Sequence, residues 1–115
     1  MAEYLVLIYE EEKSYEAADE ATMKRVMDGH MKFGEKHGAV IKGGNALEST
    51  STATSVRKGA TGDLNVTDGP FSETKEGLGG YYVIEAADLD AALVIARDVP
   101  AEFGGVEVRP IRVFD

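Results

Sequence analysis

The most informative stretch of this chain is Val66 to Glu85, which reads Val-Thr-Asp-Gly-Pro-Phe-Ser-Glu-Thr-Lys-Glu-Gly-Leu-Gly-Gly-Tyr-Tyr-Val-Ile-Glu. It starts inside a short β-type run that ends at Asp68, Gly69 and Pro70, three residues that favour turns for different physical reasons. An Asp in a turn normally accepts a hydrogen bond from the backbone N–H two residues later, but Pro70 has no N–H. The carboxylate of Asp68 is therefore held at the end of a strand and is partly free for other work.

Two interpretations of Asp68 stay open at this point. The carboxylate is either a functional group or a turn-stabilising group that accepts a hydrogen bond from the backbone N–H of Phe71 or Ser72. The simplest interpretation of Phe71 is a hydrophobic plug that pins the loop to the core. The strand predicted after this loop, Tyr81 to Glu85, is apolar at both parities.

The same stretch resembles the Asp-Gly-Pro-Phe signature of the YCII-related (DGPF) family, which consists of small ferredoxin-like domains whose reaction is mostly unassigned. The resemblance spans nearly the whole chain, from the Tyr-Leu-Val-Leu-Ile-Tyr start at Tyr4 to Val-Glu-Val-Arg-Pro at Pro110. YCII-like domains are similar to muconolactone isomerases and other dimeric α+β barrels. The resemblance therefore implies an α+β, ferredoxin-like domain that forms a dimeric α+β barrel.

Length and composition agree with one folded domain over residues 1–115. The apolar fraction of 43% and the charged fraction of 29% are those of a globular chain rather than a disordered one. The longest apolar run, Leu5 to Tyr9, is far too short to span a membrane, and no export segment precedes it. We therefore expect no membrane partner and a cytoplasmic location.

Charge and cysteine content narrow the classes of partner. A net charge of −9 repels phosphate backbones, so nucleic acid is not an expected partner. The chain has no cysteine, which excludes disulfides and thiolate chemistry. By default, the acidic run Glu10 to Glu12 is interpreted as a solvated surface.

Hydrophobic periodicity predicts a βαβββαβ-like order of elements. Strands are expected at Tyr4–Tyr9, around Val40 and Ile41, at Thr52–Lys58, Leu64–Thr67 and Tyr81–Glu85, and from Val106 to Val113. Gly62 is available for a positive φ in a hairpin turn. Pro110 separates two stretches of opposite parity in the last strand, which predicts a bulge or bend in an edge strand.

Two helices are expected. The first begins between Ser14 and Asp19 and ends at His37, with Gly38 as its terminator. The second runs from Leu89 to about Asp98 with Asp88 as N-cap. Two helices cover only one face of a sheet, yet the strands starting at Tyr4 and Tyr81 are apolar on both faces. Because an uncovered apolar face usually marks a partner surface, we predict a homodimer with a two-fold interface.

His30 is the candidate catalytic residue of the first helix. It belongs to the apolar stripe of that helix, so its ring is expected to point at the sheet. Gly29 and Gly34 lie beside it, and an interior Gly costs a helix roughly 0.5 to 1 kcal/mol relative to Ala, which suggests a reason such as space for a cavity. An ordinary core histidine bonded to a backbone carbonyl is the alternative interpretation.

The family resemblance implies a site made of a His from the first helix and the Asp of the signature. In this sequence those residues are His30 and Asp68. A carboxylate that holds one imidazole nitrogen fixes the tautomer and leaves the other nitrogen as a general acid or base. Because the pair contains no nucleophile, proton transfer is its natural chemistry.

Four residues are candidate ligand contacts. Arg109 offers a bidentate anchor for an anionic ligand. Tyr81 and Tyr82 point to opposite faces of their strand, so one hydroxyl is expected to line the pocket, and Tyr81 is chosen here. Pro70 and Phe71 of the signature complete the set. No cofactor motif is present, and His30 and His37 are about 10.5 Å apart along the helix, which argues against a metal site.

The predicted function is that of a small-molecule enzyme or enzyme-like domain that performs isomerisation, elimination or hydrolysis by proton transfer. An oxygenated, cyclic or dienoic substrate is implied by the resemblance alone. The alternative is a non-catalytic ligand-binding or regulatory module, because relatives of this family often accompany extracytoplasmic-function sigma factors. A third hypothesis is a structural dimer with no ligand.

Overall fold

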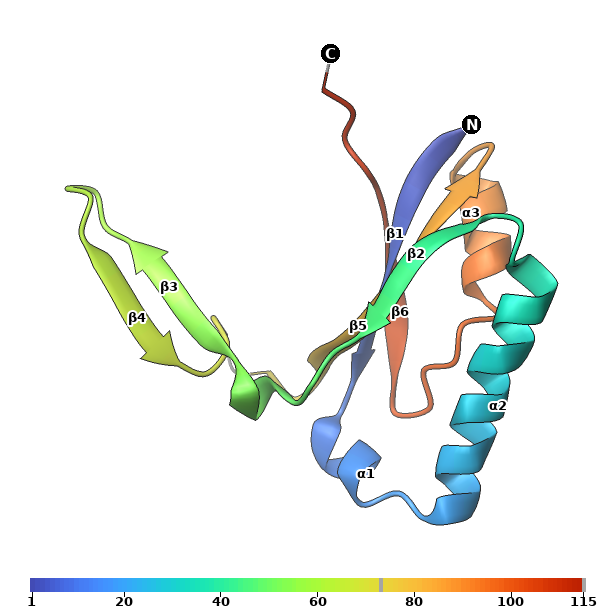
Figure 1. Ribbon diagram of the computed structural model, residues 1–115, viewed down its shortest axis with the longest axis horizontal. Helices are drawn as coiled ribbons and strands as arrows, with labels where there is room; N and C mark the ends of the chain where they lie inside the picture. Colours follow the sequence, from blue (N-terminus) through green and yellow to red (C-terminus); the bar gives the residue numbers. More distant parts are fainter. Residues whose placement is uncertain (73, 115) are drawn as a thin grey trace.

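The computed structural model describes residues 1–72 and 74–114. These residues form six strands, three α-helices and one 3-10 turn (Figure 1). Their order is β1 (Ala2–Glu10), α1 (Glu12–Glu16), α2 (Glu20–His37), β2 (Ile41–Ala46), the turn Thr50–Thr52, β3 (Thr54–Lys58), β4 (Leu64–Asp68), β5 (Gly77–Ala86), α3 (Leu89–Ala96) and β6 (Gly104–Pro110). A strand is present at each of the six predicted segments, and the short helix α1 is additional to the two predicted helices.

Four of the strands form one antiparallel sheet in the order β2-β5-β1-β6. Helices α2 and α3 lie together on one face of this sheet (Figure 1). Strands β5 and β1 lie in the centre of the sheet, and β2 and β6 are its edges. This mixed α+β arrangement is consistent with the ferredoxin-like fold that the sequence predicted.

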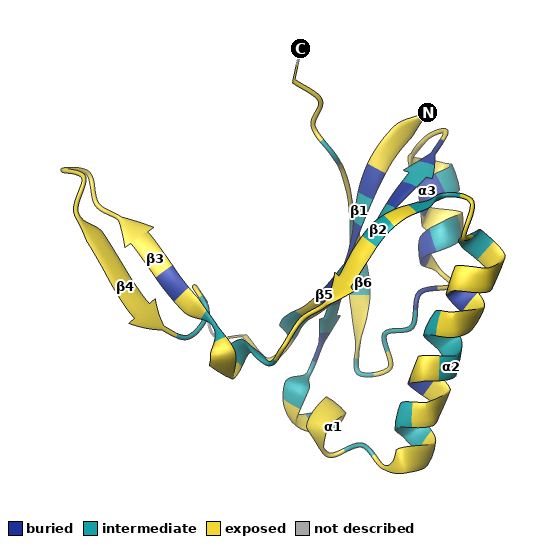
Figure 2. Cartoon of the chain, in the orientation of Figure 1, coloured by how far each residue is buried: buried dark blue, intermediate teal, exposed yellow. Residues whose placement is uncertain are grey.

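The core lies between the sheet and the two helices (Figure 2). Phe33 of α2 and Ile84 of β5 are 1% and 0% exposed, and they pack against alternate residues of β1, namely Tyr4, Val6 and Ile8. Side chains alternate between the faces of a strand. The residues of opposite parity in β1, Leu5 and Leu7, therefore point to the outer face, over which no helix of the described residues lies.

Strands β3 and β4 form a separate two-stranded sheet, which we call the arm (residues 54–68). Figure 1 shows the arm standing away from the body of the molecule. The radius of gyration is 16.2 Å, whereas a compact domain of this length has about 13 Å. The predicted hairpin is confirmed, and Gly62 takes a positive φ of 89° in its turn.

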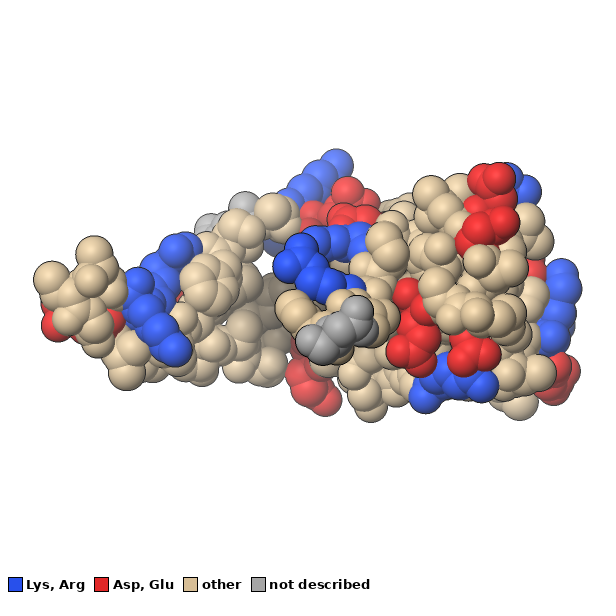
Figure 3. Space-filling model, turned by 90° about the horizontal axis from the view of Figure 1, so that it is seen from above, with Lys and Arg blue, Asp and Glu red and all other residues tan. Residues whose placement is uncertain are grey.

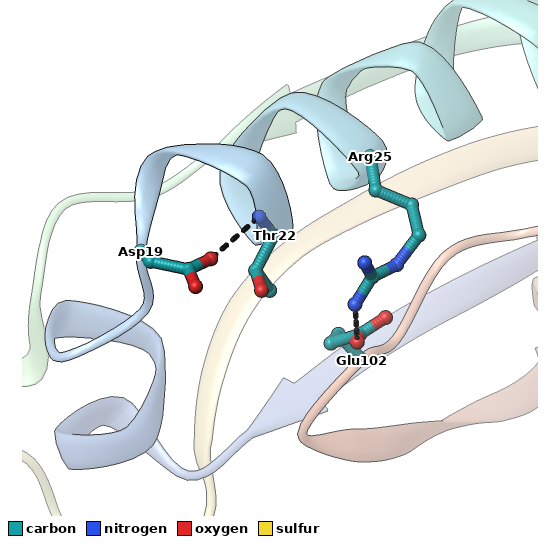
Figure 4. A network of polar contacts seen from close by, with 4 residues as sticks. All are labelled: Asp19, Thr22, Arg25 and Glu102. Carbon is teal, nitrogen blue, oxygen red and sulfur yellow. Dashed lines mark hydrogen bonds and ion pairs between the residues drawn. The ribbon is translucent and has the colours of Figure 1, made fainter.

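Capping residues define the helix starts that the sequence indicated. The Asp19 carboxylate accepts a hydrogen bond from the backbone N–H of Thr22 at 2.8 Å, and Asp88 does the same for Ala91 at 2.9 Å. Arg25 of α2 forms an ion pair with Glu102 in the loop before β6 (Figure 4). Helix α2 ends at His37 as predicted.

Several details differ from the prediction. Gly38 closes α2 with φ of −52°, so it does not use the left-handed region. Strand β6 pairs with β1 without a register shift up to Pro110, so the expected bulge is absent from these pairs. The prediction that β6 is an edge strand is confirmed. Strand β5 begins at Gly77, because its glycines take up extended backbone in place of a loop.

Candidate functional site

A cavity of about 530 Å³ opens between α1, α2 and the ends of β1, β2 and β5 that lie nearest α1. Its volume is in the range of small-molecule sites. Part of its wall is backbone, because Gly44 of β2 and Gly77, Gly79 and Gly80 of β5 line it without side chains. A Cβ added at Gly80 would lie 2.9 Å from the carbonyl oxygen of Asn45, so this close strand approach requires glycine.

His30 reaches into this cavity from α2. Its Nδ1 lies 2.7 Å from the hydroxyl oxygen of Tyr82 on β5, and the two ring centroids are 5.9 Å apart. Both side chains are half-buried. Burial lowers the pKa of the His30 imidazole and raises the pKa of the Tyr82 phenol. At neutral pH the imidazole is therefore uncharged and the phenol keeps its proton.

Glu10, at the end of β1, also lines the cavity. It is only 7% exposed, and no group among the described residues makes a hydrogen bond to its Oε2. Burial, with a smaller effect from the charge of Glu102, raises the pKa of the Glu10 carboxyl. A buried oxygen without a hydrogen-bond partner costs free energy, so Oε2 has an open hydrogen-bonding position. The interpretation of Glu10 as part of a solvated charge run is wrong.

Glu12 holds the rim of the cavity in place. Its carboxylate accepts hydrogen bonds from the backbone N–H and the hydroxyl of Thr50, both at 2.9 Å, and from the hydroxyl of Ser49 at 3.1 Å. These bonds, the backbone one first, lower the pKa of Glu12. The side chain therefore joins α1 to the segment that leads into the arm, and its role is structural.

Comparison with known proteins now identifies the family. The model of the YCII-related domain matches residues 2–115. The chain belongs to the YCII-related domain family. An uncharacterized protein of Rhizobium meliloti (strain 1021) is 38% identical over 120 residues, a match that covers 96% of this chain and 93% of the relative. The predicted membership of the YCII-related family is confirmed.

In this YCII-related domain, the signature residues do not line the cavity of His30. Asp68 ends β4 and is exposed on the arm, and Pro70 is half-buried in the loop that follows. Phe71 is 59% exposed, with the Arg57 guanidinium 4.5 Å from its ring centroid. The prediction that Phe71 plugs the core of its own chain is therefore wrong. Within one chain, His30 and Asp68 are not brought together, because Asp68 does not line the cavity of His30.

Of the other two predicted ligand contacts, one lines the cavity and one does not. Tyr81 lines the cavity, and its hydroxyl accepts a hydrogen bond from the side-chain amide of Asn45 at 2.8 Å. Arg109 does not line the cavity: it pairs with Leu5 of β1 on the outer face, and its side chain is 70% exposed. Tyr82, the alternative to Tyr81 in the sequence analysis, provides the hydroxyl that contacts His30.

The glycines beside His30 have another explanation. A Cβ at Gly29 would lie 2.8 Å from Cγ of Pro100, whereas a Cβ at Gly34 would meet nothing within 4 Å. Gly29 therefore permits close contact with the loop after α3, and the proposed link to a cavity is wrong for it. His37 lies elsewhere, with Nε2 2.7 Å from Asp98.

Charges are mixed on the surface of the domain. Figure 3 shows Lys and Arg side chains on the arm and, interspersed with Asp and Glu, over the body. Within residues 1–72 and 74–114, no three His, Cys, Asp or Glu side chains are grouped as metal ligands, and no helix is long and apolar enough to cross a bilayer.

Proposed function

We propose that this YCII-related domain is a small-molecule enzyme that moves protons, with His30 and Tyr82 as its reacting pair. The observation that carries the proposal is the 2.7 Å contact between His30 Nδ1 and the Tyr82 hydroxyl oxygen in the wall of a 530 Å³ cavity. A neutral imidazole beside a protonated phenol supplies both a base and an acid at neutral pH.

The pair carries out proton transfer most simply in one tautomer. The Nδ1–H of His30 donates to the Tyr82 oxygen, which leaves the lone pair of Nε2 as the base and the phenol proton as the acid. Nε2 accepts a proton from the substrate, Tyr82 donates its proton to a second substrate atom, and the Nδ1 proton passes to Tyr82. The proton count is unchanged and the imidazole ends as its other tautomer. Because the substrate gains and loses one proton, this relay fits an isomerisation, and it fits an elimination in which Tyr82 protonates the leaving oxygen.

The predicted pair of His30 and Asp68 would require two copies of the chain. Asp68 lies on the arm, so its carboxylate would have to reach His30 from the arm of a second copy. Within one chain, four glutamates line the cavity, and among them only Glu10 is buried. We therefore propose Glu10 as the acidic group that contacts the substrate.

We further propose that the domain forms a homodimer through the outer face of its sheet, so that the two sheets close an α+β barrel. The outer face carries the apolar β1 side chains Leu5, which is partly exposed, and Leu7, which is 8% exposed. The arm supports the same proposal, because Val56 and Val66 face each other across it and are 46% and 67% exposed. An isolated two-stranded hairpin is only marginally stable in water, so the arm gains stability from a partner.

A metabolite screen tests the enzymatic proposal. Compounds that raise the melting temperature of the wild type are incubated with it in D₂O, and deuterium uptake into each compound is followed by NMR. Tyr82→Phe should slow uptake by roughly 100-fold or more, the usual size of a general acid–base contribution. Tyr4→Phe, a matched change at a residue that does not line the cavity, is the control.

The outcomes separate the hypotheses. Uptake that is lost in Tyr82→Phe and kept in Tyr4→Phe supports the proposal. Uptake that survives Tyr82→Phe and is lost in Asp68→Asn contradicts it and supports the other pair. Ligand binding with no uptake in the wild type supports the non-catalytic ligand-binding or regulatory module.

A further inference from the structure

We propose that the ligand of this cavity carries no negative charge, and that the site prefers a compact cation or an uncharged hydroxyl or carbonyl compound with an apolar body. This inference rests on the proposed function, because it concerns the ligand of the same cavity. It goes further by defining the chemical class of that ligand.

The charge of the cavity wall is the first observation. Four glutamates line it, Glu10, Glu12, Glu16 and Glu48, and the lining contains no Lys or Arg among the described residues. The net charge of −9 for the whole chain has the same sign. Because a cleft lined by one sign of charge concentrates ligands of the opposite sign, an anion meets repulsion here from both near and distant charges.

The four glutamates occupy different positions between the opening of the cavity and its inner wall. Glu12 is fully used by its bonds to Ser49 and Thr50. Glu16 and Glu48 are exposed and lie at the rim, where their charges act on an approaching ligand. A ligand therefore enters through a negatively charged opening before it reaches the inner wall.

Glu10 is the second, independent observation. Its Oε2 is buried and has no partner among the described residues, in a side chain that is 7% exposed. This oxygen can accept a hydrogen bond from an ammonium or hydroxyl group, or donate one to a carbonyl when the carboxyl is protonated. A carboxylate or phosphate on the ligand would instead bring two acidic groups together in a buried place, which costs free energy.

The other residues of the cavity wall indicate an apolar body for the ligand. Met27, Leu47 and Ile8 supply apolar surface, and Tyr15 and Tyr82 supply aromatic rings. Aromatic faces attract cations as well as apolar groups. Arg109, the residue that the sequence offered as an anchor for an anion, lies on the outer face of the sheet and is not available to this cavity.

The test uses three probes of nearly one shape: phenethylammonium, phenethyl alcohol and phenylacetate. Each is titrated into the protein at low ionic strength, and binding is followed by the NMR signals of the His30 ring, which report on the cavity without any turnover. Glu48→Lys reverses one charge at the rim. Glu35→Lys makes the same change on α2 at an exposed residue that does not line the cavity, and it serves as the matched control.

We expect phenethylammonium and phenethyl alcohol to bind at least about tenfold more tightly than phenylacetate, with the cation at least as tight as the alcohol. Glu48→Lys should narrow this difference by a few-fold, and Glu35→Lys should leave it almost unchanged. Phenylacetate that binds as tightly as the other two, and shifts His30, would overturn this inference but leave the cavity as the site of the proposed enzyme. Binding of none of the probes up to their solubility limits would overturn the cavity as the ligand site, and with it both proposals.

Discussion

The imidazole of His30 contacts the hydroxyl of Tyr82 in the wall of the cavity, with 2.7 Å between Nδ1 and the phenol oxygen. This contact joins the middle of α2 to β5, two elements that are far apart in the sequence. Phe33, one turn later on α2, packs its ring against Tyr82 at 4.7 Å between centroids, which fixes the phenol from the core side. The pair is thus held by packing on one side and faces open space on the other.

Removing the Tyr82 hydroxyl should destabilise the fold modestly. Tyr82→Phe leaves the half-buried His30 Nδ1 without its partner, so the free energy of unfolding should fall by about 1 kcal/mol, as for other single hydrogen bonds. Urea unfolding of the wild type, Tyr82→Phe, His30→Gln and the double variant measures this. If the effects of the two single changes simply add, the two side chains are not coupled and the contact has no energetic role.

His30 should titrate below the ordinary histidine pKa of 6.5, because burial disfavours its charged form. The stability that the neutral ring contributes is present above pH 6.5 and is lost as the pH falls through the folded-state pKa. NMR titration of the ring signals measures this value. The chain has only two histidines, so His30→Gln assigns the signals. A pKa at or above 6.5 would contradict the burial of the ring.

Glu10 should have the opposite effect on pH dependence. Its folded-state pKa is raised above 4.5, so below pH 4.5 both states are protonated and burial of the group has no charge penalty. As the pH rises through the folded-state pKa, the penalty for ionising the buried carboxyl grows. Glu10→Gln should therefore gain stability relative to wild type between about pH 4 and pH 7. A difference in unfolding free energy that stays constant over this range would show that Glu10 is not desolvated.

The dimer proposal predicts a selective effect of a lysine on the outer face. Wild type should sediment as a dimer at micromolar concentration, and Leu5→Lys should weaken association at least about tenfold, because it places a charge in an apolar contact. Met31→Lys is the matched control, since Met31 is 63% exposed on α2. A monomeric wild type, or equal effects of both variants, would contradict an interface on this face.

Two glycines of α2 should respond in opposite directions to the same change. Gly34→Ala has open space for the new Cβ and should stabilise the helix by roughly 0.5 to 1 kcal/mol. Gly29→Ala would place its Cβ 2.8 Å from Pro100 Cγ and should destabilise the protein, because the loop after α3 must move. Thermal unfolding measures both. Equal stabilisation by the two changes would show that Gly29 does not contact Pro100 closely.

The sequence predicted those parts of the fold that depend on local chemistry. Asp19 and Asp88 cap helices, and Gly62 turns the hairpin, because each requirement is met within a few residues. The orientation of His30 followed from the helical period, which places it on the same face as Phe33. These features need no knowledge of distant contacts.

The partners in the site depend on tertiary contacts and were harder to predict. The alternation of a strand puts Tyr81 and Tyr82 on opposite faces but does not say which face the helix covers. Glu10 was interpreted as surface because it begins an acidic run, whereas its side chain is only 7% exposed at the end of β1. The turn at Asp68 was recognised, but its distance from the body depends on how the arm leaves the sheet.

Nitrogen-15 NMR of the His30 ring tests the central claim most directly, because it reports the protonation and tautomer of each ring nitrogen. The spectrum is recorded at neutral pH for wild type, Tyr82→Phe and Asp68→Asn. We predict a neutral ring with its proton on Nδ1 in wild type, a clear change of the tautomer ratio in Tyr82→Phe, and no change in Asp68→Asn. A His30 spectrum that is altered by Asp68→Asn and unaffected by Tyr82→Phe would contradict the assignment of Tyr82 as the partner of His30.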